Sequence, residues 1–219
     1  MPAYDAVLFD NDGVLVDPPA DETKLAAARD AFREVGVETP AQHHLEAIIG
    51  GVSPDLLHDV ADAYDLAPAD LWDARERHDE RSQVEQFEAG ARTTYDDVGA
   101  VTDLSHPCGI VSSNHHTTVA FILDYFELAG AFDTYYGREM TVESLTLKKP
   151  NPHYLEQALD DLDAETGLYV GDSEHDVVAA HRAGLNSVFL RREHNREFEL
   201  GVEPTFEVDS LDVLPELAE

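Results

Sequence analysis

Short apolar runs and helical stripes alternate along much of the chain. Four runs have the length and the Gly, Asp or Ser flanks of buried parallel strands, namely residues 4–9, 108–111, 167–170 and 187–190. Apolar residues between them recur at helical spacing, as at 119, 122, 123 and 126. The alternation after residue 96 predicts an α/β fold with a doubly wound, Rossmann-like parallel sheet covered by helices on both faces. A short strand and a closing helix are expected after residue 203.

Residues 17–95 break this alternation. They contain four helix-type patterns and no convincing strand, the patterns being 21–35, 41–49, 53–63 and 68–88. We therefore expect an inserted helical domain at 17–95 and an α/β core made of 1–16 and 96–219. Arg75, Arg77 and Arg81 alternate with acidic residues in the last helix, which predicts a solvated, salt-bridged face.

Charge restricts the possible partners. The 219 residues include 46 Asp or Glu and 14 Lys or Arg, a formal net charge of -32. Such a chain repels nucleic acid and anionic membranes. The acidic residues are spread along the sequence, and at ~1 M salt, where the Debye length is about 3 Å, a carboxylate-rich surface is screened and stays hydrated. This pattern predicts a halophilic protein.

Several features favour a cytoplasmic location. No apolar run approaches the roughly 18 residues of a membrane span. The first residues lack the basic region of an export signal. The single cysteine, Cys108, has no partner for an internal disulfide and is expected in the core.

Polar residues follow three of the predicted strands. They are Asp10 and Asp12; Ser112, Ser113 and Asn114; and Asp172 and Asp176. Ligands bind at the carboxyl edge of an open α/β sheet, so these residues are expected to converge. Clustered carboxylates repel one another unless cations lie among them, and Mg²⁺ with the ammonium of Lys149 would meet that need.

Four segments, in order, resemble the motifs of the haloacid dehalogenase superfamily of aspartate-nucleophile phosphohydrolases. They are FDNDGV at 9–14, IVSSN at 110–114, KKPNP at 148–152 and VGDSEHDV at 170–177. The resemblance covers essentially the whole chain. The helical insertion is similar to the cap of the branch that contains phosphoglycolate phosphatases and beta-phosphoglucomutase-like proteins.

The resemblance implies a role for each acidic residue. Asp10 would attack phosphorus to form an aspartyl-phosphate, and Asp12 would protonate the leaving oxygen and then activate water. Mg²⁺ would be held by the side chains of Asp10 and Asp172 and the backbone carbonyl of Asp12. Asp176 would orient metal-bound waters or Lys149.

The same resemblance implies contacts to substrate. Ser112, Ser113 and Asn114 would hold phosphoryl oxygens, and Lys149 would balance their charge. IGGVSP at 49–54 resembles the cap specificity loop, so Gly51 and Val52 are candidate substrate contacts.

The expected partner is a small phosphorylated metabolite. An acidic residue at position 12 favours phosphoryl transfer over dehalogenation. The specificity loop lacks the basic side chains of mutase-type relatives, which favours a small monophosphate ester such as phosphoglycolate. Two alternatives stay open: a sugar-phosphate mutase of the beta-phosphoglucomutase type, and a receiver-like module that stores a phosphoryl group without turnover. The chain could act as a monomer or a homodimer.

Overall fold

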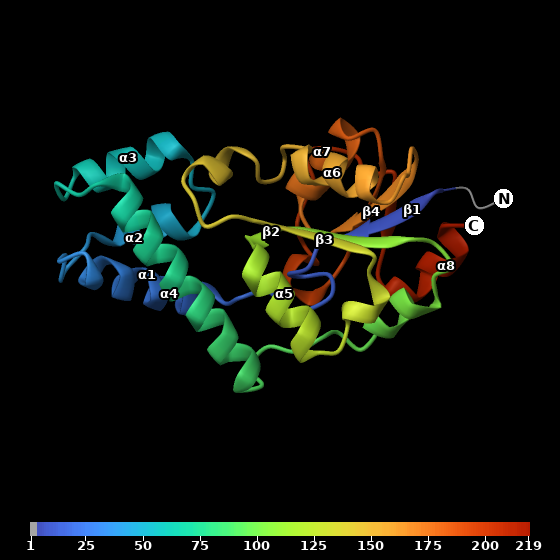
Figure 1. Ribbon diagram of the computed structural model, residues 1–219, viewed down its shortest axis with the longest axis horizontal. Helices are drawn as coiled ribbons and strands as arrows, with labels where there is room; N and C mark the ends of the chain where they lie inside the picture. The colour runs from blue at the N-terminus through green and yellow to red at the C-terminus, as the bar shows by residue number, and fades with distance from the viewer. Residues whose placement is uncertain (1–3) are drawn as a thin grey trace. The chain divides into compact units, whose positions relative to one another are not determined.

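The computed structural model describes residues 4–219, which form two compact units (Figure 1). Unit 1 runs to Pro18 and continues over Thr93–Gly137 and Leu147–Glu219. Unit 2 consists of Pro19–Arg92 and Arg138–Thr146. Among the residues described, no helix is both long and apolar enough to cross a membrane.

Unit 1 is built on a six-stranded sheet with the order β3-β2-β1-β4-β5-β6. The strands are β1 Ala6–Phe9, β2 Cys108–His115, β3 Thr134–Arg138, β4 Gly167–Gly171, β5 Asn186–Leu190 and β6 Phe206–Val208. β1 pairs in parallel with both β2 and β4, so that Phe9 is level with Ile110 on one side and Val170 on the other. The residues that follow these three strands therefore share one edge of the sheet, and the predicted α/β class is confirmed.

Each face of the sheet carries its own apolar cluster. Val7 and Phe9 of β1 belong to one cluster, and Leu8 between them belongs to the other, as strand alternation requires. The helices of unit 1 are α5 His116–Tyr125, α6 His153–Asp161, α7 Glu174–Arg182 and α8 Leu214–Leu217. Cys108 lies in the first cluster at 2% exposure, as expected, and burial raises its pKa to about 12.

β3 was not predicted from the sequence. It lies at the edge of the sheet, and its residues are Thr, Tyr, Tyr, Gly and Arg, of which the first three are not buried. A strand that is only partly covered needs no continuous apolar run, so its signal is β-propensity alone.

Unit 2 contains the four expected helices: α1 Asp21–Glu34, α2 Gln42–Ile49, α3 Pro54–Asp62 and α4 Pro68–Glu88. It also includes Arg138–Thr146, a segment that the sequence analysis placed in the core. Leu145 packs into the apolar cluster of unit 2, and Arg138 forms an ion pair with Glu76 of α4. These contacts explain why the segment belongs with the helices.

The expectation of a fully solvated face on α4 is wrong in part. Arg77 is exposed and pairs with Glu34 on α1, as predicted. Arg75 is buried, however, and its guanidinium lies 2.6 Å from the fully buried Glu76. On this side of the helix Arg75 donates to the Ile48 carbonyl of α2 at 3.2 Å and Glu76 pairs with Arg138, and the ion pairs compensate the buried charges.

Candidate active site

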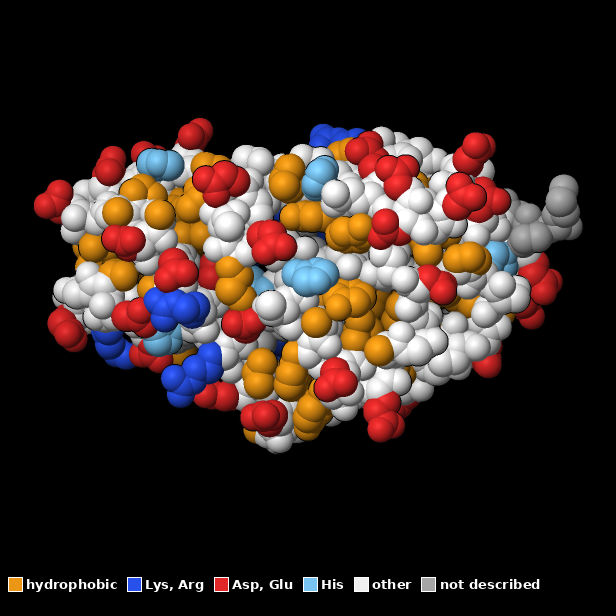
Figure 2. All heavy atoms as spheres, viewed as in Figure 1, with side chains coloured by type: hydrophobic (Ala, Val, Ile, Leu, Met, Phe, Trp, Pro, Cys, Tyr) orange, Lys and Arg blue, Asp and Glu red, His pale blue; other side chains and the backbone are white. Residues whose placement is uncertain are grey.

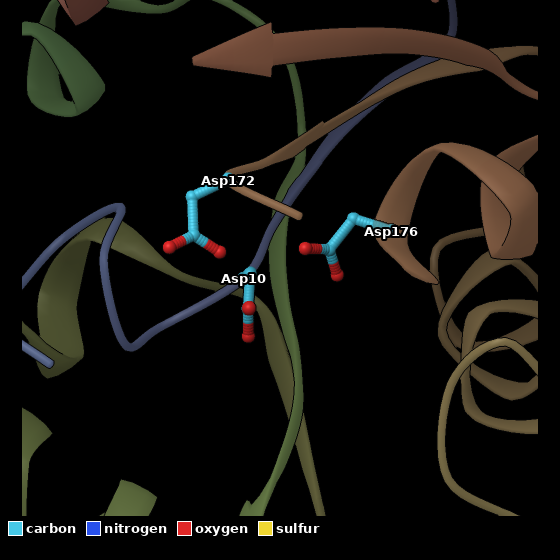
Figure 3. Close-up of side chains that lie close together, drawn as sticks. All are labelled: Asp10, Asp172 and Asp176. Carbon is cyan, nitrogen blue, oxygen red and sulfur yellow. The ribbon is translucent and has the colours of Figure 1, made fainter. Parts of the chain in front are cut away.

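Three aspartates converge at the carboxyl edge of the sheet. Asp10 follows β1 directly, Asp172 follows β4, and Asp176 lies in the first turn of α7. One carboxylate oxygen from each lies within 4.8 Å of the other two, and Figure 3 shows the three side chains close together. The pairing of β1 with β4 produces this arrangement, because it makes their ends neighbours.

Lys149 places a positive charge inside this cluster. Its Nζ lies 2.8 Å from Asp10 Oδ1 and 2.6 Å from Asp176 Oδ1. It also donates to the Tyr169 hydroxyl at 2.8 Å and the Val111 carbonyl at 3.3 Å. The side chain is 6% exposed, so its position is fixed by these partners and not by solvent.

Burial and neighbouring charges shift the pKa values of Asp10, Asp176 and Lys149 in different directions. Burial raises the pKa of Asp10 well above its ordinary value, and the charge of Lys149 opposes the rise only in part. Asp176 is as deeply buried, yet Lys149 and Ser173 outweigh that effect and lower its pKa. Burial alone would lower the pKa of Lys149, but Asp10 and Asp176 raise it instead. Lys149 and Asp176 therefore form a buried ion pair, and burial opposes the ionisation of Asp10.

The hydrogen bonds show which oxygens are available for a cation. Asp176 Oδ1 contacts Lys149 and Tyr169, and its Oδ2 accepts from the backbone N–H and hydroxyl of Ser173. Asp10 uses only Oδ1, which accepts from the Asn11 N–H at 2.7 Å and from Lys149. Its Oδ2 has no hydrogen-bond partner among residues 4–219.

Asp172, like Asp10, has one carboxylate oxygen that accepts no hydrogen bond from any residue the structure describes. Its Oδ2 lies 2.6 Å from His194 Nε2, whereas its Oδ1 makes no hydrogen bond within the described part of the chain. Burial raises the pKa of Asp172, against the opposing effect of the His194 hydrogen bond. Two neighbouring carboxylates, each with one oxygen that accepts from no donor in the described part of the chain, are chemically suited to a hard divalent cation. Asp10 and Asp172 thus fit a metal site, and Asp176 instead holds Lys149.

Asp12 lies beside the cluster but outside its set of three carboxylates. Its Oδ2 accepts a hydrogen bond from Asn114 Nδ2 at 2.7 Å. Gly13 follows with a φ of 80°, a left-handed conformation that favours glycine and turns the chain away after β1.

The predicted phosphate-holding segment lies at the end of β2. Ser112 is buried, and its Oγ accepts from the Asn114 backbone N–H at 3.1 Å. Asn114 Oδ1 accepts from the His115 N–H at 2.8 Å. Ser113 is partly exposed beside them. The Asn114 side chain therefore bridges Asp12 and the start of α5, and any direct contact with substrate stays a prediction.

Gly51 and Val52 lie in unit 2, between α2 and α3. Gly51 is exposed, and Val52 is 3% exposed and packs in the apolar cluster of that unit. The Val52 side chain is therefore used for packing within unit 2. Their contact with substrate also stays a prediction.

Sequence reasoning missed Tyr169 and His194. Tyr169 lies within an apolar run, and nothing in that run indicates that its hydroxyl donates to Val111 O and accepts from Lys149. His194 lies in a polar segment after β5, 22 residues from Asp172. Its only sequence signal is its position just after a strand at the functional edge.

Comparisons with known proteins agree with this geometry. The chain is 29% identical to the pyrophosphatase PpaX of Bacillus cereus (strain G9842) over 220 residues, which is 97% of this chain and 95% of that protein. CbbY from Rhodobacter sphaeroides in complex with phosphate superposes with a TM-score of 0.72 at 20% identity, covering 96% of both chains. A predicted phosphoglycolate phosphatase from Haemophilus somnus gives 0.68 at 20% identity, covering 99% of this chain and 98% of that one.

Aspartates at the ends of adjacent parallel strands, one of them paired with a buried lysine, form a candidate active site at the carboxyl edge of an α/β fold. The family model for haloacid dehalogenase-like hydrolases matches residues 7–190. The chain belongs to the haloacid dehalogenase-like hydrolase family, and its enzyme class is that of a HAD-like phosphatase.

Proposed function

We propose that the protein is a Mg²⁺-dependent phosphohydrolase that cleaves a small phosphate monoester through an aspartyl-phosphate on Asp10. The observation that carries this proposal is the pattern of contacts at the two oxygens of the Asp10 carboxylate. Oδ1 is fixed by Lys149 at 2.8 Å and by the Asn11 N–H, and Oδ2 is left without a donor in a buried, cation-compatible site. A carboxylate held in a fixed orientation is suited to nucleophilic attack.

The reaction has two steps. In the first, an oxygen of Asp10 bonds to phosphorus while the bond to the leaving oxygen breaks, and Asp12 gives that oxygen a proton. In the second, Asp12 takes a proton from water as the water oxygen attacks phosphorus. The phosphorus bond to Asp10 then breaks and releases inorganic phosphate.

Other residues provide charge and position. Asp10 and Asp172 would hold the divalent cation with the backbone carbonyl of Asp12, and its charge would stabilise the transferring phosphoryl group. Lys149 would contribute a second positive charge from the opposite carboxylate oxygen of Asp10. The Ser112 hydroxyl and the N–H groups at the start of α5 would bind phosphoryl oxygens.

The helical insertion, predicted at 17–95, is proposed to act as a cap that excludes water during the reaction. Its loop at 49–54 has no basic side chain, which favours a substrate with one phosphate, such as phosphoglycolate, over a sugar bisphosphate. Inorganic pyrophosphate is a second candidate, because the relative at 29% identity is a pyrophosphatase.

A panel of phosphate esters tests the function. Wild type and Asp10→Asn would be assayed with phosphoglycolate, pyrophosphate, hexose phosphates and p-nitrophenyl phosphate, with and without Mg²⁺. We expect phosphate release by wild type only with the cation, and a loss on the order of 10⁴-fold or more in Asp10→Asn. Activity that survives in Asp10→Asn would refute the nucleophile assignment.

The same panel separates the alternatives. Isomerised sugar phosphate without release of inorganic phosphate would identify a mutase. A phosphorylated Asp10 that persists for hours, with no turnover of any ester, would identify a phosphoryl-storing module.

The acidic surface supports a further proposal, that the protein is adapted to high salt. Figure 2 shows Asp and Glu side chains spread over the visible face, with few Lys or Arg. We expect the melting temperature to rise from about 0.1 M to about 3 M KCl, because the Debye length falls from about 10 Å to below 3 Å and repulsion is screened. Maximal stability in dilute buffer would contradict the proposal. An equal rise with an uncharged osmolyte would instead indicate surface exclusion.

A further inference from the structure

The turn after β5 is attached to the strand end that carries Asp172. It comprises Arg192 and the short helix η4, Glu193–Asn195. Asn195 is 7% exposed, and its Nδ2 donates to the Asp172 carbonyl at 2.8 Å and to the Leu190 carbonyl at 3.0 Å. Its Oδ1 accepts from the Arg192 N–H at 2.7 Å. The turn and the backbone of Asp172 therefore form one hydrogen-bonded unit.

A second anchor ties this turn to the loop after β1. The Arg192 guanidinium donates to both carboxylate oxygens of Asp97, each at 2.8 Å, and to the Val14 carbonyl at 2.9 Å. A bidentate pair fixes orientation as well as distance. One of the two residues between Arg192 and Asn195 is of interest, because its side chain is thus carried on a rigid support.

That residue is His194, and its Nε2 lies 2.6 Å from Asp172 Oδ2. The pair lies directly against Gly13, where an added Cβ would be 1.9 Å from Asp172 Oδ2 and 3.0 Å from His194 Nε2. Only a glycine leaves room for this contact. The Gly13 backbone and the His194 imidazole therefore enclose Asp172 Oδ2 from two sides.

A carboxylate held at one oxygen cannot rotate freely, and so its other oxygen has a fixed direction. Asp172 Oδ1 is that other oxygen, and the carboxylate faces Asp10 in the cluster (Figure 3). Hydrogen-bond partners of ligating carboxylates fix their orientation and thereby contribute to metal affinity.

We propose that His194 is a positioning residue, whose Nε2–H donates to Asp172 Oδ2 and presents Oδ1 to the divalent cation shared with Asp10. The inference rests on the proposed cation site but adds a residue from outside the four motifs. Because it concerns binding of the cation, it can be tested without turnover.

The test compares two substitutions at one position. His194→Phe keeps a flat ring and removes the donor, whereas His194→Gln retains an N–H of similar reach. Affinity for Mg²⁺ and Mn²⁺ would be measured by calorimetry and by the Mn²⁺ electron paramagnetic resonance signal, without substrate. We expect about 10- to 100-fold weaker binding in His194→Phe and substantial recovery in His194→Gln.

Glu193→Gln is the matched control. It changes the same turn, but the Glu193 carboxylate pairs with Arg196 in solvent, so affinity should stay close to that of wild type. Circular dichroism and cation-free melting curves would verify that each variant folds.

Three outcomes would contradict the inference or its basis. Unchanged affinity in His194→Phe, with binding abolished in Asp172→Asn, would overturn the role of His194 and leave the cation site intact. Unchanged affinity in Asp172→Asn would refute the site itself. Equal losses in His194→Phe and His194→Gln, larger for Mn²⁺ than for Mg²⁺, would make the imidazole a direct ligand and overturn the positioning role.

Discussion

Lys149→Met should destabilise the protein by about 3–5 kcal/mol at neutral pH, because it leaves the buried carboxylates of Asp10 and Asp176 without their shared cation. Turnover should fall by roughly 10²- to 10³-fold or more in the folded fraction, since one charge that stabilises the transferring phosphoryl group is removed. Urea unfolding and steady-state kinetics at saturating Mg²⁺ would measure the two effects separately.

The stability loss should depend on pH in a defined direction. In wild type, Lys149 and Ser173 lower the pKa of Asp176, so this group stabilises the fold above its ordinary unfolded pKa and loses that contribution as pH falls. In Lys149→Met, burial instead favours the protonated carboxyls. The difference between the two proteins should therefore be small near pH 4 and grow toward pH 7. A constant difference over this range would argue against a charge effect.

Lys148→Met is the matched control, because the contacts with Asp10 and Asp176 are made by Lys149. It removes the same charge from the same loop. We expect nearly wild-type stability and turnover. Equal losses in both variants would mean that the loop needs any cation and that the contact of Lys149 with Asp10 is not decisive.

Lys149 also illustrates how far sequence reasoning extends. The strands at 4–9 and 167–170 were predicted from apolar runs. The polar residues that follow these strands were correctly expected at one edge of the sheet. In an open parallel sheet the carboxyl ends of the strands lie at one edge, so the residues that follow them meet there. Repulsion between the carboxylates at that edge requires a cation nearby. The sequence does not determine which carboxylate oxygen accepts a hydrogen bond from which donor. For Asp176 the resemblance implied contacts with metal-bound waters or with Lys149, and the side-chain geometry places it against Lys149 and Ser173.

Two other features depended on tertiary contacts that no local pattern encodes. Arg138–Thr146 belongs with the helices because Arg138 finds Glu76, 62 residues away. His194 reaches Asp172 because Asn195 and Arg192 fix a turn whose partners come from three separate segments. Hydrophobic periodicity predicts which face of a helix or strand is buried. It does not predict which distant residues pack against that face, and these contacts depend on that.

Asp12→Asn should separate the two steps of the proposed reaction. The variant cannot protonate an alkoxide leaving group, so hydrolysis of phosphoglycolate should fall by about 10²- to 10⁴-fold. p-Nitrophenolate leaves without protonation, and its ester should still phosphorylate Asp10. The second step also lacks its base, so the phosphorylated enzyme should accumulate. We expect a burst of p-nitrophenolate of about one equivalent per active site, followed by slow turnover.

Stopped-flow absorbance would measure the burst, and intact-protein mass spectrometry would detect one added phosphoryl group. Asp10→Asn,Asp12→Asn should show neither signal, because the attacking oxygen is lost. Asn114 donates to Asp12 Oδ2 at 2.7 Å, so Asn114→Ala tests whether the position of Asp12 matters while its carboxyl is kept. A smaller loss with alkyl esters and no burst is expected there. Alkyl ester turnover in Asp12→Asn within about 10-fold of wild type would exclude Asp12 as the acid, since a proton donor of this kind contributes at least about 10²-fold.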